Sequence, residues 1–143
     1  MLIPKRIFSQ VEGVLRVRDR LEPEAKMALY KARRAADGAA ARRIGKQQAQ
    51  RMVRRCEKRL EAARQWQAVF ALLDRTFPAG SEEGKVAALL YGEKRTQEEI
   101  CALFQCTRQT VRRRRDNYVC HCALFAAAAG LIQIREDEHD ADR

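Results

Sequence analysis

The chain has 143 residues, a length that suits one domain or a small domain with a helical appendage. Hydrophobic residues make up 46% of it and aromatic residues only 6%, which argues against wholesale disorder and favours helices over sheets. The net charge is +10, from 29 Lys and Arg against 19 Asp and Glu. A basic excess of this size indicates a polyanionic partner, either nucleic acid or an anionic membrane surface.

The charge is unevenly distributed. Residues 1–65 carry a net charge of +11 and residues 66–143 a net charge of −1. The most apolar stretch, 122–134, falls short of the roughly 20 residues that a membrane-spanning helix needs, and the first residues lack the apolar core of a signal peptide. We therefore predict an all-α, cytoplasmic protein with no membrane partner and with five reduced cysteines.

The first 36 residues predict a pair of helices. Pro4 can begin the first helix, which should run to about Arg20. A break is expected at 21–23, where Pro23 suits the first turn of the second helix. The glycine-containing stretch 37–46 has no clear period and is predicted to be a linker.

A long helix is predicted over residues 47–77. Its apolar stripe can seat it on the C-terminal domain or form the seam of a homodimer. Its opposite face is basic, and both solvated charge and phosphate binding remain open for that face. The stripe is Met52, Cys56, Leu60, Ala63, Trp66, Phe70, Leu73 and Phe77, and the basic face is Arg51, Arg54, Arg55, Lys58, Arg59 and Arg64.

Residues 78–134 predict a helix-turn-helix domain, followed by a disordered acidic tail over 135–143. Ser81 can cap a first short helix with Val86, Leu89 and Leu90 on its buried side. Thr96 and Glu99 fit a capping box for the next helix, in which Ile100, Leu103 and Phe104 form an apolar face. Thr107 can cap the last helix, in which Val111, Tyr118, Cys122 and Phe125 should point inward.

The start of this last helix is expected to face outward and to enter a major groove of double-stranded DNA. Arginine can bond guanine, and glutamine can bond adenine, through two hydrogen bonds each. The predicted base contacts are Arg108, Gln109, Arg112 and Arg113. Phosphate contacts, which position a protein without reading sequence, are predicted for Thr96, Thr107, Thr110 and Arg115.

The segment 96–116, TQEEICALFQCTRQTVRRRRD, resembles the end of sigma factor region four, with the pattern T-x-E-E-I-x-x-x-F-G-V-T-R-x-x-I-R. Matching residues are Thr96, Glu98, Glu99, Ile100, Phe104, Thr107, Arg108, Val111 and Arg112. The whole layout is similar to phage transcription regulators of the RinA and ArpU type. The resemblance implies promoter recognition by the last helix and activation of late or packaging genes in prophages of Gram-positive bacteria.

Two residues depart from the sigma pattern. Gln105 replaces the usual glycine, so it must adopt a left-handed or bridging backbone conformation. Arg114 replaces an apolar residue on the inward face, so either its stem carries the charge outward or the helix rotates slightly.

No metal, cofactor or enzymatic activity is predicted. Cys120 and Cys122 point to nearly opposite sides of a helix, so they are poorly placed to bind one metal ion. Cys101, Cys106 and His121 are the other candidate ligands, but the sequence contains no C-x-x-C pair. The sequence also lacks a nucleophile-and-base signature and a glycine-rich phosphate loop.

Two alternatives stay open beside a transcription regulator. A small terminase-type packaging subunit would form large rings in solution. A protein that binds RNA polymerase without specific DNA binding would tolerate alanine at the predicted base contacts.

Overall fold

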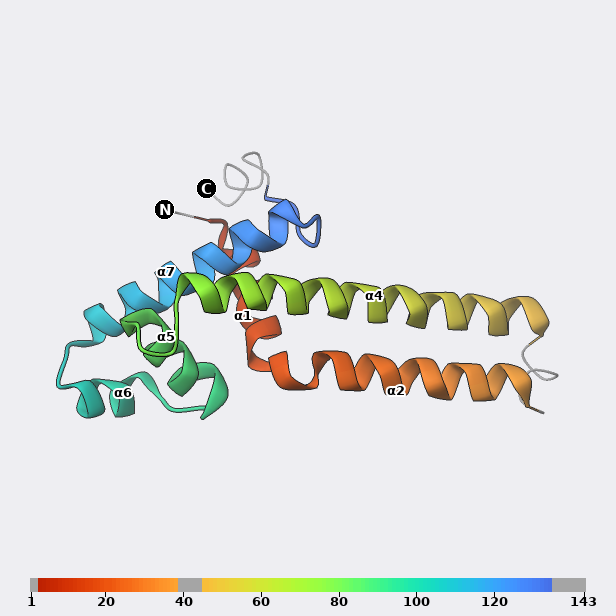
Figure 1. Cartoon of the computed structure of the whole chain (residues 1–143), viewed down its shortest axis with the longest axis horizontal. Coiled ribbons are helices and arrows are strands. Elements are labelled where there is room, and N and C mark those ends of the chain that lie inside the picture. The colour runs from red at the N-terminus through yellow and green to blue at the C-terminus, as the bar shows by residue number, and fades with distance from the viewer. Residues whose placement is uncertain (1–2, 39–44, 135–143) are drawn as a thin grey trace. The chain divides into compact units, whose positions relative to one another are not determined.

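The structure is a computed structural model that describes residues 3–38 and 45–134 (Figure 1). All regular structure in these two ranges is helical, which confirms the all-α prediction. Most of the predicted linker and the whole acidic tail lie outside the described residues. The helices are α1 (Lys5–Arg16), α2 (Arg18–Asp37), α4 (Lys46–Thr76), α5 (Glu82–Ala87), η1 (Ala88–Gly92), α6 (Gln97–Phe104) and α7 (Arg108–Ala128).

The chain divides into two compact units. Unit 1 is Met1–Val17 with Ala68–Arg143, and unit 2 is Arg18–Gln67. Two helices, α1 and α2, are present in the N-terminal region as predicted, but they belong to different units. The long helix also contributes to both units and is not a segment of its own.

The predicted break between the first two helices is wrong in its position. α1 already ends at Arg16, and Pro23 lies inside α2. A proline at this place removes one hydrogen bond, the one to the carbonyl of Asp19, which lies in the exposed first turn of α2 where water can hydrate it. The helix can therefore start five residues before its proline.

Unit 2 is a helical hairpin. Its core joins Ala25 and Leu29 of α2 to Leu60 and Ala63 of α4, and Figure 1 shows the two helices side by side. The N-terminal part of the predicted stripe thus packs on α2, a partner that the sequence did not indicate. Met52 is the exception, with 39% of its surface exposed.

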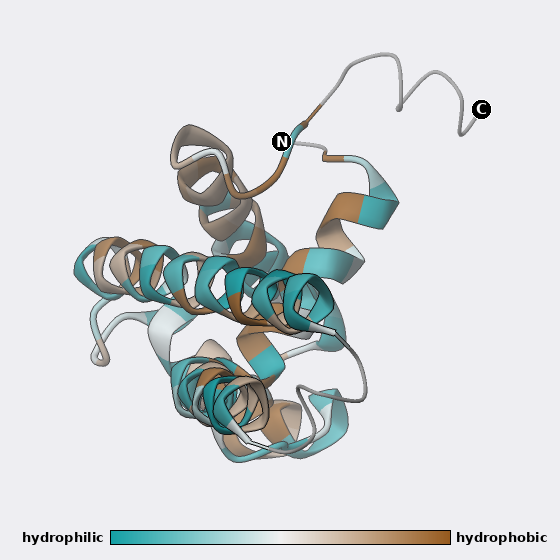
Figure 2. Ribbon diagram, turned by 90° about the vertical axis from the view of Figure 1, so that its right-hand side faces the viewer, coloured by the Kyte–Doolittle hydropathy of each residue, from teal (hydrophilic) through white to brown (hydrophobic). Residues whose placement is uncertain are grey.

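Unit 1 has a core to which α1 contributes directly. Ile7, Val11 and Leu15 recur every four residues and are buried, on a helix that packs against α7. Phe70 and Leu73, at the end of α4, are also fully buried. Hydrophilic and hydrophobic residues alternate along the helices in Figure 2, as expected of amphipathic helices that each bury one side.

Helix α5 begins as predicted. Ser81 caps it by accepting a hydrogen bond from the Gly84 backbone N–H at 3.1 Å. Val86 is fully buried, whereas Leu89 and Leu90 are half-buried and the inward residue of η1 is Tyr91. No helix in the described part of the chain is long and apolar enough to cross a membrane.

Candidate nucleic-acid interface

Helix α6 starts with the predicted capping box. The Thr96 hydroxyl accepts a hydrogen bond from the Glu99 backbone N–H at 3.2 Å, and the Glu99 carboxylate accepts one from the Thr96 N–H at 3.3 Å. Arg95 donates a further hydrogen bond to Glu99 at 3.1 Å, and this bond, with those from Thr96, lowers the pKa of the Glu99 carboxyl. The start of α6 is therefore fixed by local polar contacts.

The turn between α6 and α7 has the expected left-handed residue. Gln105 has φ 52° and ψ 47°, and the Cys106 N–H then bonds to the Cys101 carbonyl at 3.2 Å. Thr107 caps α7, because its hydroxyl accepts a hydrogen bond from the Thr110 N–H at 3.2 Å. These contacts set the direction in which α7 leaves the turn.

A small core holds α6 and α7 together. Val86, Ile100 and Val111 are fully buried against one another, and Cys101 and Cys106 pack on them. The predicted apolar face of α6 is wrong beyond Ile100, since Leu103 and Phe104 are 58% and 36% exposed. The buried side of this short helix is turned toward Cys101, which leaves those two side chains in solvent.

One side of α7 faces this core and the other is open. Val111 and Cys122 are fully buried and Tyr118 is 5% exposed, as the inward stripe predicted. Gln109 and Arg113 lie two residues to either side of Val111, so at about 100° per residue each points roughly 160° away from it. Both side chains are exposed, and so is Arg112.

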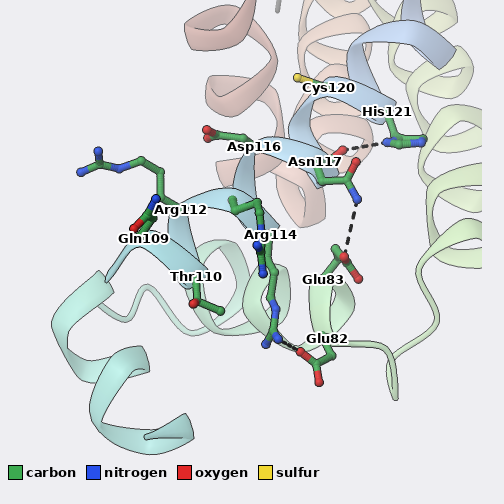
Figure 3. Close-up of a pocket in the computed structure, with 11 residues that line it drawn as sticks. Glu82, Glu83, Gln109, Thr110, Arg112, Arg114, Asp116, Asn117, Cys120 and His121 are labelled. Atoms are coloured by element: carbon green, nitrogen blue, oxygen red, sulfur yellow. Dashed lines mark hydrogen bonds and ion pairs between the residues drawn. The ribbon is translucent and has the colours of Figure 1, made fainter. Parts of the chain in front are cut away.

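Arg112 and Arg113 also differ from their neighbours in having no ion pair within the described residues. Arg108 pairs with Glu98 of α6. Arg114 pairs with Glu82 at the start of α5 (Figure 3). Its side chain is 25% exposed, so its stem carries the charge outward, the first of the two outcomes expected for it.

Arg115 lies in different surroundings from those expected of a phosphate contact. Its guanidinium bonds to Asp116 at 2.9 Å and stacks over the Phe8 ring at 5.2 Å. Only 20% of the side chain is exposed. Arg115 thus joins α1 to α7, and this role was missed because Phe8 is more than one hundred residues away in sequence.

The other predicted phosphate contacts lie on the surface at the starts of α6 and α7. Thr96 and Thr107 are exposed and Thr110 is half-buried. The hydroxyls of Thr107 and Thr110 are 3.0 Å apart and hydrogen-bonded to each other. A phosphate oxygen at this end of α7 would meet hydroxyl donors and the positive end of a helix dipole.

The open side of α7 borders a wide hollow. Gln109, Thr110, Arg112 and Arg113 line it together with Glu82, Glu83 and Asp116, and Figure 3 shows Arg112 extending away from the helix while Arg114 turns toward Glu82. Glu83 accepts a hydrogen bond from Asn117 at 3.5 Å. Glu82 and Glu83 thus line the hollow from α5, whereas Asp116 lines it from α7, the helix that also carries Arg112 and Arg113.

Two long-range contacts hold α1 against this domain. The Tyr91 hydroxyl donates a hydrogen bond to the Glu12 carboxylate at 2.9 Å, and the Lys94 ammonium donates one to the Arg16 carbonyl at 2.5 Å. Burial first, and then the Glu12 charge, raise the pKa of Tyr91 above its ordinary value. Neither contact has a local signal, because the partners are 78 or 79 residues apart.

The cysteines of unit 1 behave as small apolar residues. Cys120 and Cys122 are buried, and burial raises the pKa of Cys120. Burial and the nearby Cys106 raise the pKa of Cys101. In residues 3–38 and 45–134, no three His, Cys, Asp or Glu side chains are grouped to hold a metal ion.

No protein-family model, curated protein or solved structure matches this chain.

Proposed function

We propose that this chain binds double-stranded DNA sequence-specifically and regulates transcription, with the start of α7 in a major groove. The observation that carries the proposal is the outward position of Gln109, Arg112 and Arg113, unpaired within the described chain, on a helix whose other side is fixed by a core and by caps. A helix of roughly 10–12 Å diameter fits a major groove about 12 Å wide.

The three side chains match the chemistry of base edges. Arg112 and Arg113 can each donate two parallel hydrogen bonds to guanine, and Gln109 can pair with the donor and acceptor of adenine. Arg108 contacts a base as well once its ion pair with Glu98 is broken. Breaking this pair costs little, because an exposed ion pair stabilises by at most about 1 kcal/mol. Thr96, Thr107 and Thr110 then contact phosphates, whereas Arg115 is left out since it is engaged with Asp116 and Phe8.

The resemblance of 96–116 to sigma factor region four supports this assignment. On the same resemblance, we propose that the chain is a phage or prophage regulator that activates late genes in the cytoplasm and contacts RNA polymerase. Self-association is a further part of the proposal, although Leu60 and Ala63 of the expected seam already pack on α2.

The test is selection of bound sequences from a random DNA pool, followed by titration of the selected duplex and its single-base variants. Gln109→Ala and Arg113→Ala should each lower the discrimination at one base position by about 1–3 kcal/mol. Arg75→Ala is the matched control, because it removes an exposed charge from the same unit on another helix.

The proposal is overturned if no sequence is enriched, or if Gln109→Ala and Arg113→Ala reduce the affinity for every duplex alike. Equal binding of RNA polymerase by wild type and variants, without specific DNA affinity, would instead identify a polymerase-binding protein. A ring-sized mass in solution would identify a packaging subunit, whereas a monomer or dimer supports the regulator.

A further inference from the structure

Unit 2 carries a higher density of positive charge than the unit that contains α7. Among the described residues, unit 2 has 13 Lys and Arg against 6 Asp and Glu, a net charge of +7. The described part of unit 1 has 12 against 8, a net charge of +4, although it is about twice as long. The helical hairpin is thus the more basic part of the molecule.

Five of these cations gather on one face of α4, which we call the α4 basic face. At about 100° per residue they span roughly 140° of the helix, opposite the stripe that packs on α2. All five side chains are exposed. They are Arg51, Arg54, Arg55, Lys58 and Arg59.

Three of the six described acidic residues of the hairpin, Glu22, Glu24 and Glu57, pair with cations outside the α4 basic face. Glu22 lies 3.2 Å from Lys26 and 3.8 Å from Arg64. Glu57 lies 3.9 Å from Arg33. Within the described residues, no member of the α4 basic face forms an ion pair, so this face keeps its full charge.

We propose that the α4 basic face is a second DNA-binding surface, which holds phosphates without reading sequence. Between Arg51 and Arg59 the helix rises about 12 Å, and over that length of duplex axis one strand carries three or four phosphates, one per roughly 3.4 Å of axis. A membrane surface fits less well, because a membrane-bound helix buries an apolar face and the apolar face of α4 here packs on α2.

This inference rests on the proposed function, from which it takes DNA as the partner. It assigns phosphate binding to unit 2 and base recognition to unit 1. Phosphate contacts supply affinity and strong salt dependence, whereas base contacts supply discrimination. In unit 1, the charges of Arg114 and Arg115 are largely compensated by neighbouring carboxylates, and Arg108 must first leave Glu98 to reach DNA. Much of the affinity for any duplex would then come from unit 2.

The experiment compares two quadruple variants of the full chain by fluorescence anisotropy at several salt concentrations. The first variant replaces Arg51, Arg54, Arg55 and Lys58 by Gln, which keeps helix propensity. The matched control replaces Arg20, Lys26, Arg33 and Arg64 by Gln, four cations of the same unit that have carboxylate partners. Far-ultraviolet circular dichroism verifies that both variants are folded.

For the first variant, the plot of log K against log salt, where K is the association constant for DNA, should be less steep by about 3–4 than for the wild type. Its binding should be more than tenfold weaker near 0.1 M salt. The loss should be the same for the selected duplex and a scrambled one, and the control should change little. Equal slopes in the two variants, or binding of the face to anionic phospholipid vesicles and not to DNA, would overturn the inference. If the wild type itself binds the selected duplex and the scrambled one equally well, that result counts against the proposed function instead.

Discussion

Replacing Gln105 by glycine should stabilise the protein. Gln105 holds a left-handed conformation with φ 52°, which costs a residue with a Cβ atom roughly 1–2 kcal/mol. Glycine removes this cost but loses about 0.5–1 kcal/mol more conformational entropy on folding. Because the Gln105 side chain is exposed and packs on no core, the expected net gain in the free energy of unfolding is about 0.5–1 kcal/mol.

Urea denaturation followed by far-ultraviolet circular dichroism measures this gain as a higher midpoint at an unchanged slope. Gln105→Ala is the matched control, because it removes the same side chain but keeps the Cβ atom and therefore the strain. The reasoning fails if glycine and alanine have the same midpoint, since the left-handed conformation would then cost nothing.

Three further substitutions test the packing of unit 1. Gly84→Ala should cost about 1–3 kcal/mol, because its Cβ would lie 2.2 Å from a backbone carbonyl oxygen, whereas Gly13→Ala in open space should not destabilise; urea midpoints compare them. Tyr91→Phe should cost about 1.5–3 kcal/mol, the value of a hydrogen bond to a charged group such as Glu12. Folding raises the pKa of Tyr91, so the unfolded chain loses the tyrosine proton first as the pH rises. The stability advantage of the wild type over Tyr91→Phe should therefore be complete below pH 10 and shrink above it, in denaturation series from pH 8 to 11.5. Leu15→Ala should cost about 2–5 kcal/mol in urea denaturation if α1 belongs to the core of unit 1, and a loss below 1 kcal/mol would contradict that assignment.

The features that the sequence predicted well are local ones. Ser81, Thr96 and Thr107 act as caps, and each bonds to a residue three positions later. The left-handed turn at Gln105 was expected on a different ground, because the sigma pattern that the segment resembles has a glycine at this position. The capping contacts depend on spacing alone, so they can be predicted before any tertiary structure is known.

The features that the sequence did not predict depend on partners far away in the chain. The helical spacing of Phe8, Val11 and Leu15 in the sequence indicated a buried face on the first helix, but nothing in it identified α7 as the element that covers that face. Arg115 was predicted to contact phosphate. Its stacking partner Phe8 belongs to the distant helix α1, and no pattern near Arg115 indicates that contact. Leu103 was assigned to the core because a two-turn helix has too few residues to fix which side is buried.

The run of arginines at 112–115 illustrates why a count of charges overstates what one helix can bind. Consecutive helical residues point in four different directions, so the run cannot present one basic surface. Arg114 and Arg115 turn to carboxylates and to Phe8, and their charge serves the packing of α7 on α5 and α1. Arg112 and Arg113 remain for an external ligand, and two cations give a weak dependence on salt. If the chain binds DNA with a steep salt dependence, the additional phosphate contacts must come from another part of it, and α4 offers five exposed cations on one face.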